Sequence, residues 1–223
     1  MTHVFQGGGL AARATFARNG SNLVVTLENI SPCDVTCPEE VLTAVFFDLD
    51  GLDSDTLTPV SAVLSDGSHV LFPISGDGTA SGQIGGEYGF WPDLGAGPSW
   101  MGQTVISAVG LGNLIGPKTL FPGPPLYSPD SPNGLAYGLV CSADDPNGGN
   151  AKVTGAVPLV QTGVTFTLAG LPEGYALADS VHNVAFNYGT DLSPIPAPGA
   201  LVLGIIGMAM VGWRTCRRRP DLD

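Results

Sequence analysis

Much of this chain alternates apolar and polar residues with a period of two, which is typical of β-strands that bury one face. The run "NLVVTLE" shows the pattern clearly, because Leu23, Val25 and Leu27 share one face. The pair Asn19-Gly20 precedes this run, and Asn-Gly favours the two positive φ angles of a type I′ turn. We therefore predict a β-hairpin around residue 20.

Further strands are expected along the rest of the chain. "EVLTAVFFDLDG" is apolar on both faces and predicts a central strand. "TLTPVSAVLSDGSHVLFPIS" predicts a second hairpin with Asp66-Gly67 at its turn. Other strands are expected in "GQTVISAVGLG", "NGLAYGLVCSA", "GAVPLV", "VTFTLAGL" and "SVHNVAFNYGTDL". No segment before residue 199 keeps a helical period over three turns, so residues 1–188 predict an all-β, antiparallel, jelly-roll-like β-sandwich.

Glycine and proline are abundant, with 32 and 19 residues among 223, which disfavours long helices. They concentrate in residues 73–101 and 111–134, which we predict to be long loops. The first of these segments holds several aromatic residues, namely Tyr88, Phe90, Trp91 and Trp100. They could stack on sugars or on another protein, but we favour the interpretation that they cap the open end of the sandwich.

The C-terminus has a different pattern. Residues 189–198 are expected to be a linker. The 17 residues from Ala197 to Trp213 carry no charge and span about 25 Å as a helix, at the short end of what crosses a bilayer core of about 30 Å. We therefore predict a transmembrane helix over residues 199–213 and a basic cytoplasmic tail over residues 214–223. The alternative, a buried core helix, normally shows a polar stripe, and none is present.

This order of Pro-x-Pro motif, short apolar helix and arginine cluster resembles the PEP-CTERM sorting signal of Gram-negative bacteria. The resemblance implies recognition by exosortase, a membrane protease that cuts near the proline motif and frees the body. Ala197 stands where that family usually has Glu. The matching motif positions are Pro196, Ala197, Pro198 and Gly199, and the matching basic retention cluster is Arg214, Arg217, Arg218 and Arg219.

The body is also similar to the ectodomain of exosortase-dependent surface proteins, whose biochemical role is unassigned. The similar segments are "VLTAVFFDLDG", "GGEYGFWPDL" and "HNVAFNYGT". Together the two resemblances imply an exported protein that is held in the inner membrane as a precursor and then reaches the cell surface or extracellular matrix. They imply exosortase as a partner. The leading hypothesis from the sequence as a whole is a structural or adhesive role without catalysis, with extracellular polysaccharide as a candidate ligand.

Export requires an N-terminal signal, and "MTHVFQGGGLAARATF" has neither a basic region nor an apolar stretch of that kind. We expect the leader to lie upstream of Met1, through a late start assignment or a truncated gene. A tail-anchored cytoplasmic protein is the alternative, but it would place the arginines on the wrong side of the membrane.

Charge excludes one class of function. Residues 1–198 carry four basic residues against eighteen acidic ones, a net charge of −14. So acidic a body repels a phosphate backbone, and nucleic-acid binding is not expected. Acidity suits a secreted surface that stays soluble or gathers cations.

Calcium is the one cofactor that the sequence brings into consideration. Asp48, Asp50, Asp53 and Asp55 crowd into "FDLDGLDSD", and Ca²⁺ favours such oxygen-rich loops. The spacing is not that of an EF-hand, and a solvated acidic turn is the simpler interpretation. "CSADDPNGGN" is a second acidic turn to which the same two interpretations apply.

Cysteine and catalytic residues give weaker signals. Cys33 and Cys37 could form a disulfide in an exported body, or they could be buried thiols. Zinc is disfavoured because the thiols and histidines do not show ligand spacing. Ser99 does not lie in a nucleophile elbow, and we interpret His69 and His182 as structural or surface histidines and not as catalytic bases. The alternative function is a carbohydrate-binding module, or a glycan-active enzyme with carboxylates on facing strands.

Overall fold

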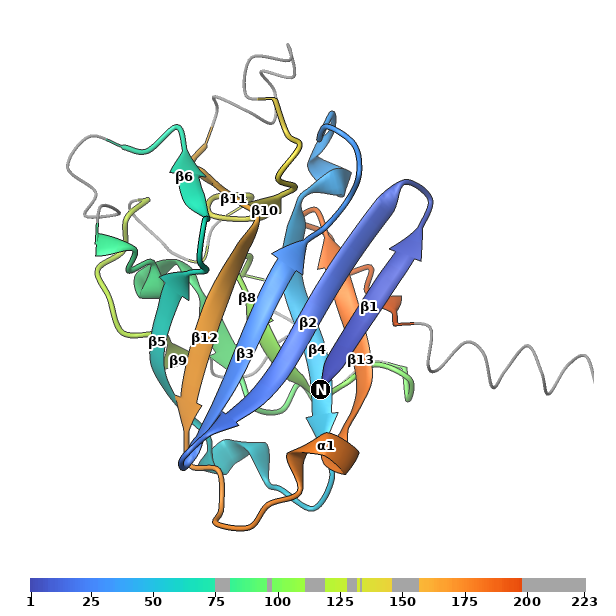
Figure 1. The fold of residues 1–223 in the computed structure, drawn as a ribbon, viewed down its shortest axis with the longest axis vertical. Coiled ribbons are helices and arrows are strands. Elements are labelled where there is room, and N and C mark those ends of the chain that lie inside the picture. The colour runs from blue at the N-terminus through green and yellow to red at the C-terminus, as the bar shows by residue number, and fades with distance from the viewer. Residues whose placement is uncertain are drawn as a thin grey trace, which may run out of the picture.

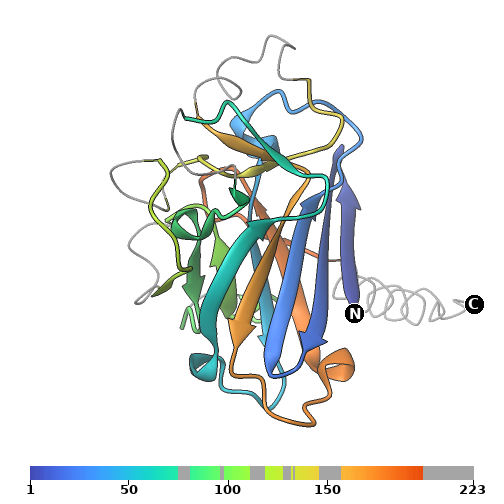
Figure 2. The same cartoon turned by 60° about the vertical axis from the view of Figure 1, so that its left-hand side comes forward.

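The computed structural model describes residues 1–74, 81–95, 98–110, 119–127, 132, 134–145 and 157–197. Within them, two β-sheets pack face to face, as Figures 1 and 2 show from two directions. The expected all-β sandwich is therefore confirmed.

The first sheet has five strands, and every neighbouring pair is antiparallel. A meander of three strands is extended by a strand from near the C-terminus, which lies between β3 and β5. The spatial order is β1 (Thr2–Gly7), β2 (Leu10–Asn19), β3 (Asn22–Asn29), β12 (Gly163–Ala169) and β5 (Thr58–Leu64).

The second sheet is mixed and not fully antiparallel as expected, because β10 and β11 run parallel while the other described pairs are antiparallel. Its main path is β6 (His69–Leu71), β11 (Leu159–Gln161), β10 (Leu139–Val140), β4 (Leu42–Leu49), β8 (Thr104–Ser107), β7 (Gly89–Trp91) and β9 (Thr119–Leu120). In addition, β13 (Val181–Tyr188) pairs with β4, and β14 (Ile195–Pro196) pairs with β13. The short helices are η1 (Pro38–Glu40), η2 (Ser54–Thr56), η4 (Gly85–Glu87) and α1 (Leu177–Ser180).

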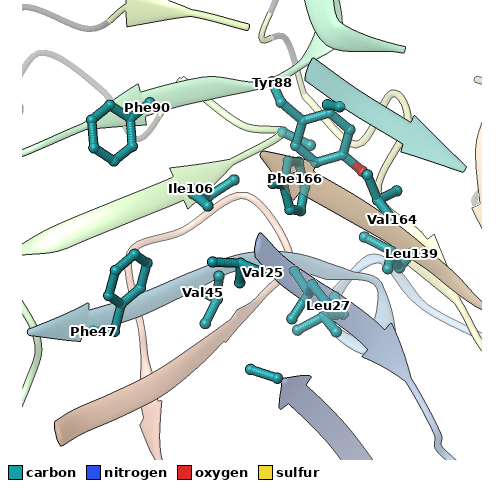
Figure 3. Close-up of a cluster of buried hydrophobic side chains, with 14 of the residues drawn as sticks. Val25, Leu27, Val45, Phe47, Tyr88, Phe90, Ile106, Leu139, Val164 and Phe166 are labelled. Carbon is teal, nitrogen blue, oxygen red and sulfur yellow. The ribbon is translucent and has the colours of Figure 1, made fainter. Parts of the chain in front are cut away.

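The core lies between the two sheets and is drawn in Figure 3. Phe16 of the first sheet meets Phe47 of the second edge-to-face, with ring centroids 5.1 Å apart. Tyr88 and Phe166 do the same at 4.9 Å. Such geometry adds about 0.5–1.5 kcal/mol per pair beyond the area that the rings bury. These contacts fix the two sheets to each other.

Tight turns join the strands of the N-terminal meander. The predicted hairpin is confirmed, but Asn19 pairs with Asn22, so the turn residues are Gly20 and Ser21. Gly20 alone supplies a positive φ there, +62°. A second hairpin, between β1 and β2, was not predicted, although Gly8 and Gly9 both take the positive φ of a type I′ turn.

The turn at Asp66-Gly67 also forms, because the amide of Ser68 donates to the carbonyl of Ser65 at 2.9 Å. The predicted pairing across it is wrong, since β5 lies in the first sheet and β6 in the second. Strand β12 pairs with β5 at six positions, whereas β6 has only three residues. Strand β12 therefore pairs with β5 in place of β6, and the turn at Asp66-Gly67 connects the first sheet to the second.

The glycine-rich segment 73–101 is not a loop throughout. Tyr88, Phe90 and Trp91 are at most 1% exposed and belong to the core in and before β7. Just upstream, a Cβ on Gly85 would lie 2.0 Å from the carbonyl oxygen of Pro122, and one on Gly86 would lie 2.1 Å from that of Pro124. These glycines therefore allow close contact between two backbone segments. From composition alone, the same glycines indicate a flexible loop.

The segment expected to be a linker is packed against the sandwich as far as the structure describes it. The amide of Gly189 donates to the Val41 carbonyl, and that of Ala197 donates to the Val184 carbonyl, both at 2.8 Å. Ala197 is 6% exposed and belongs to the main core. The folded body therefore extends through Ala197.

Within the described residues, none of the helices has the length and apolar character needed to cross a bilayer. The predicted transmembrane helix, residues 199–213, lies outside the described residues. So do Pro198, Gly199, Arg214, Arg217, Arg218 and Arg219.

Candidate functional site

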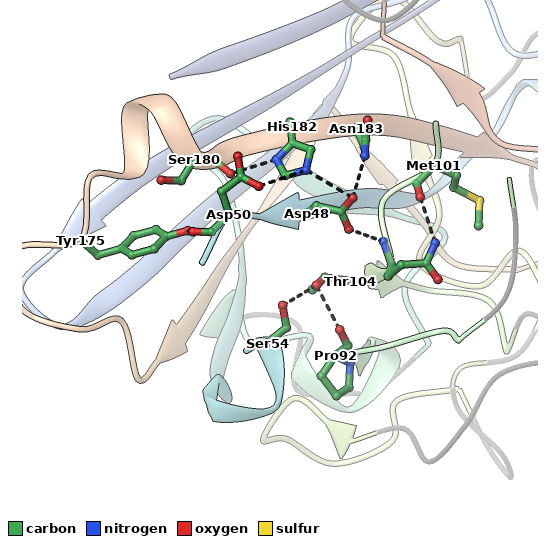
Figure 4. Close-up of polar contacts among 11 residues, drawn as sticks. Asp48, Asp50, Ser54, Pro92, Met101, Thr104, Tyr175, Ser180, His182 and Asn183 are labelled. Carbon is green, nitrogen blue, oxygen red and sulfur yellow. Dashed lines mark hydrogen bonds and ion pairs between the residues drawn. The ribbon is translucent and has the colours of Figure 1, made fainter. Parts of the chain in front are cut away.

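An acidic hollow of about 320 Å³ opens beside the end of β4. Five carboxylates and one imidazole surround it, which agrees with the acidic cluster seen in the sequence. The side chains come from the β4–η2 segment, from the segment after β7, from the start of β8 and from β13, and several are drawn in Figure 4. The titratable members are Asp48, Asp50, Asp53, Asp55, Asp93 and His182.

Asp48 links three segments of the chain within this hollow. Its Oδ1 accepts the amide of Gln103 at 2.7 Å, and its Oδ2 accepts the side-chain amide of Asn183 at 2.8 Å. One carboxylate therefore ties β4 to both β8 and β13 (Figure 4). Each oxygen of Asp48 therefore accepts one hydrogen bond, and the carboxylate is held in one orientation.

Asn183 sits at an irregularity in β13, where the register against β4 shifts between His182 and Ala185. Its φ is +49°, which is unusual for a residue other than glycine. Its carbonyl accepts the amide of Gly102 at 2.9 Å. Bulges of this kind redirect neighbouring side chains and are common beside functional sites.

His182, which precedes Asn183, lies between two carboxylates. Its Nε2 is 3.7 Å from Oδ2 of Asp48 and 3.5 Å from Oδ1 of Asp50. The other ring nitrogen, Nδ1, is 3.2 Å from the carbonyl oxygen of Ser180. The imidazole is 40% exposed, so it is accessible at the rim of the hollow and does not belong to the core.

Of the two remaining predicted ligands, Asp53 serves the local backbone. Oδ1 of Asp53 accepts the amide of Asp55 at 3.1 Å and thereby caps the short helix η2. Below them, Oγ1 of Thr104 lies 2.7 Å from Oγ of Ser54 and 3.1 Å from the carbonyl of Pro92. These bonds hold the floor of the hollow.

The structure thus brings Asp48, Asp50, Asp53 and Asp55 around one hollow, though not around one point. In the part of the chain that is described, no three His, Cys, Asp or Glu side chains are grouped closely enough to hold a metal ion. Calcium binding stays a prediction from the sequence. Sequence reasoning missed Gln103 and Asn183, because only the pairing of β4 with β8 and β13 brings them to Asp48.

A second polar cluster joins the loop before η1 to the turn after β10. The carboxylate of Asp34 accepts the amide of Asp145 at 3.0 Å, and the carboxylate of Asp144 accepts the amide of Val35 at 2.9 Å. Oδ2 of Asp144 is buried with no hydrogen-bond partner. Burial, reinforced by the carboxylates of Asp34 and Asp145, raises the pKa of Asp144 to about 6.

The cysteines lie near this second cluster. Cys33, Cys37 and Cys141 are free thiols in the structure. The possible disulfide between Cys33 and Cys37 stays a prediction from the sequence. Sγ of Cys141 donates to the carbonyl of Cys33 at 2.8 Å. Burial raises the pKa of the Cys37 and Cys141 thiols, which lowers their thiolate fraction and hence their reactivity.

An aromatic platform for sugars is not among the described residues. Trp91 is buried, and Trp100 packs against the small core cluster that contains Met101. Of the large apolar side chains counted as exposed within the described ranges, the only aromatic one is Phe72. Tyr88, Phe90 and Trp91 are therefore core residues, and Trp100 is partly buried. Capping of an open end of the sandwich stays a prediction.

Comparisons with protein-family models, with curated proteins and with solved structures found no match to this chain.

Proposed function

We propose that the chain is an exported cell-surface or extracellular-matrix protein, sorted by exosortase and structural or adhesive in role, without catalysis. The observation that supports this most strongly is the C-terminal layout. Pro196, Ala197 and Pro198 precede the uncharged residues 199–213, and an arginine cluster follows. In the proposal, residues 199–213 anchor the precursor in the inner membrane and residues 214–223 stay in the cytoplasm.

The body suits such a role. It is an all-β sandwich with most of its described phenylalanine side chains inside, and its strong negative charge favours solubility outside the cell. The jelly-roll wiring that we expected belongs to this proposal, as does transient residence in the inner membrane. Extracellular polysaccharide remains the candidate ligand of the released body.

The retention charges give a direct test. Replacing Arg214, Arg217, Arg218 and Arg219 with Gln is expected to reduce release of the body at least tenfold, because basic residues hold the cytoplasmic end of a span in place. The chain is expressed behind an export signal in a host that has exosortase, and tagged body is measured in membrane and medium. Asp221→Asn with Asp223→Asn is the control in the same tail, and equal release from all three chains would refute the proposal.

One observation favours the alternative of a glycan-binding or glycan-active protein, namely the hollow where His182 lies between Asp48 and Asp50. Carboxylates and an accessible imidazole could hydrogen-bond sugar hydroxyls or transfer protons. Incubation with acidic and neutral polysaccharides would detect binding or cleavage. Loss of either signal in Asp50→Asn, with retention in Asp66→Asn at an exposed turn, would establish this function in place of a purely structural one.

A further inference from the structure

Half of the proline motif is part of the folded body. In β14, Ile195 pairs with Phe186 and Pro196 pairs with Ala185 on the neighbouring strand β13. The next amide, that of Ala197, donates to the carbonyl of Val184 at 2.8 Å. We call residues 191–197 the strap.

The strap is anchored to the sandwich at two further points. The amide of Ser193 donates to Oδ1 of Asn187 at 2.9 Å, and Asn187 is itself fully buried and bonded to Thr43. The side chain of Ile195 packs against the main core, to which Ala197 also belongs. Hydrogen bonds and apolar burial therefore both hold the strap.

A peptide that is bound as an extended strand offers its backbone hydrogen-bonding groups and alternate side chains to its receptor. While the strap is docked, the amide and the side chain of Ala197 are already committed to β13 and the core. Pro196 has no amide hydrogen and is tolerated because β14 lies beyond β13 as a short edge strand. An edge strand of two residues has few contacts to lose, so it can open locally while the body stays folded.

We propose that docking of the strap masks Pro196 and Ala197 of the proline motif and that its detachment from β13 gates cleavage by the sorting protease. This inference rests on the proposed sorting function. The folded body then controls its own release, because the protease acts on the fraction of molecules in which the strap is open.

Docking is tested first, without any protease, on the full chain in detergent. Hydrogen exchange of the Ala197 amide is expected to be slow in the original chain. Ile195→Ala removes core packing and should speed this exchange about tenfold. Ser193→Pro, which removes the donor to Asn187 and leaves the motif intact, should act in the same direction. Leu192→Ala is the matched control, since Leu192 lies in the strap but is 37% exposed.

Gating is tested next by the rate of release in a host with exosortase. Ile195→Ala and Ser193→Pro are expected to speed release by a factor similar to that seen in exchange, and Leu192→Ala to leave it unchanged. Fast exchange of Ala197 in the original chain would overturn docking. Faster exchange with an unchanged release rate would overturn gating alone. If even the original chain is not released, the sorting function and the gate both fail, and only the docked strap stands.

Discussion

Asp144 places one carboxylate oxygen where neither solvent nor a hydrogen-bond donor reaches it. A buried polar atom without a partner costs about 1–3 kcal/mol. The neighbouring carboxylate of Asp34 adds repulsion when both groups are ionised. The contact between the two loops that meet here is consequently least stable when the Asp144 carboxylate is charged.

The pH dependence follows from this. The pKa of Asp144 is about 6 in the folded chain against 3.8 in a free side chain. The folded state therefore holds the proton more tightly, and stability falls as pH rises from about 4 to 6, by up to about 3 kcal/mol. We expect Asp144→Asn to flatten this dependence and to stabilise the chain at pH 7, as measured by urea unfolding across the pH range.

The control is Asp66→Asn at an exposed turn, which should keep the full pH dependence. If Asp144→Asn lost stability between pH 4 and 6 as steeply as the original chain, another group would be responsible.

At Asn183 two effects can be separated, the positive φ and the bond to Asp48. Asn183→Gly loses the bond but accepts the backbone angle, whereas Asn183→Ala loses the bond and strains the backbone. We expect both variants to be less stable than the original chain, with Ala about 1 kcal/mol worse than Gly. Chemical denaturation measures this, and equal stability of the two variants would show that the bulge relaxes.

At the scale of elements, close backbone contact decides the position of η4 and β7. Gly86→Ala would drive a Cβ to 2.1 Å from the Pro124 carbonyl, and the shift it forces should cost at least about 3 kcal/mol. Gly110→Ala is the matched control, because its Cβ would lie 3.4 Å from the carbonyl oxygen of Pro132, which is an ordinary van der Waals contact. Denaturant midpoints of the two variants give the comparison, and similar midpoints would contradict this explanation.

The hydrophobic pattern of the sequence predicted β3, β4, β12 and β13, because each of these strands carries its own pattern along seven or eight residues. Strand β4 is apolar on both faces, and the other three alternate. The pattern did not predict β7, whose three residues follow glycines that resemble a loop. Nor could it predict the partner of β5, because that choice depends on a strand about a hundred residues away.

The candidate site divides in the same way. The four aspartates of the β4–η2 segment were predicted because they lie close together in the sequence. Asp93, which follows β7, was not predicted. His182, Gln103 and Asn183 reach the four aspartates only through sheet register, and Asp34 meets Asp144 only through two loops. Contacts between residues that are far apart in the sequence depend on which distant strands and loops meet. The local hydrophobic pattern does not reveal this.

At the scale of the whole molecule, negative charge is in strong excess. Residues 1–198 carry a net charge of −14, and Arg13 already has its own partner in Glu28 at 2.6 Å. Self-repulsion of this kind destabilises a compact chain and is screened by salt. We expect the melting temperature to rise between about 10 and 200 mM NaCl, as followed by scanning fluorimetry.

The gain should shrink near pH 4, where carboxylates lose charge. A melting temperature that fell with salt would mean that attractive pairs dominate. Calcium at matched ionic strength separates screening from binding at the acidic hollow, because only binding would give an extra gain that Asp50→Asn removes.

The place of β12 between β3 and β5 has a consequence for how the chain is made. Pairing of segments that are distant in sequence slows folding. Here β3 and β5 cannot complete their pairing until residues 163–169 have been synthesised. Until that strand arrives, both neighbours present unsatisfied backbone groups on which another chain can form a sheet. A nascent polypeptide that has not yet reached residue 163 is therefore the species most in need of a chaperone.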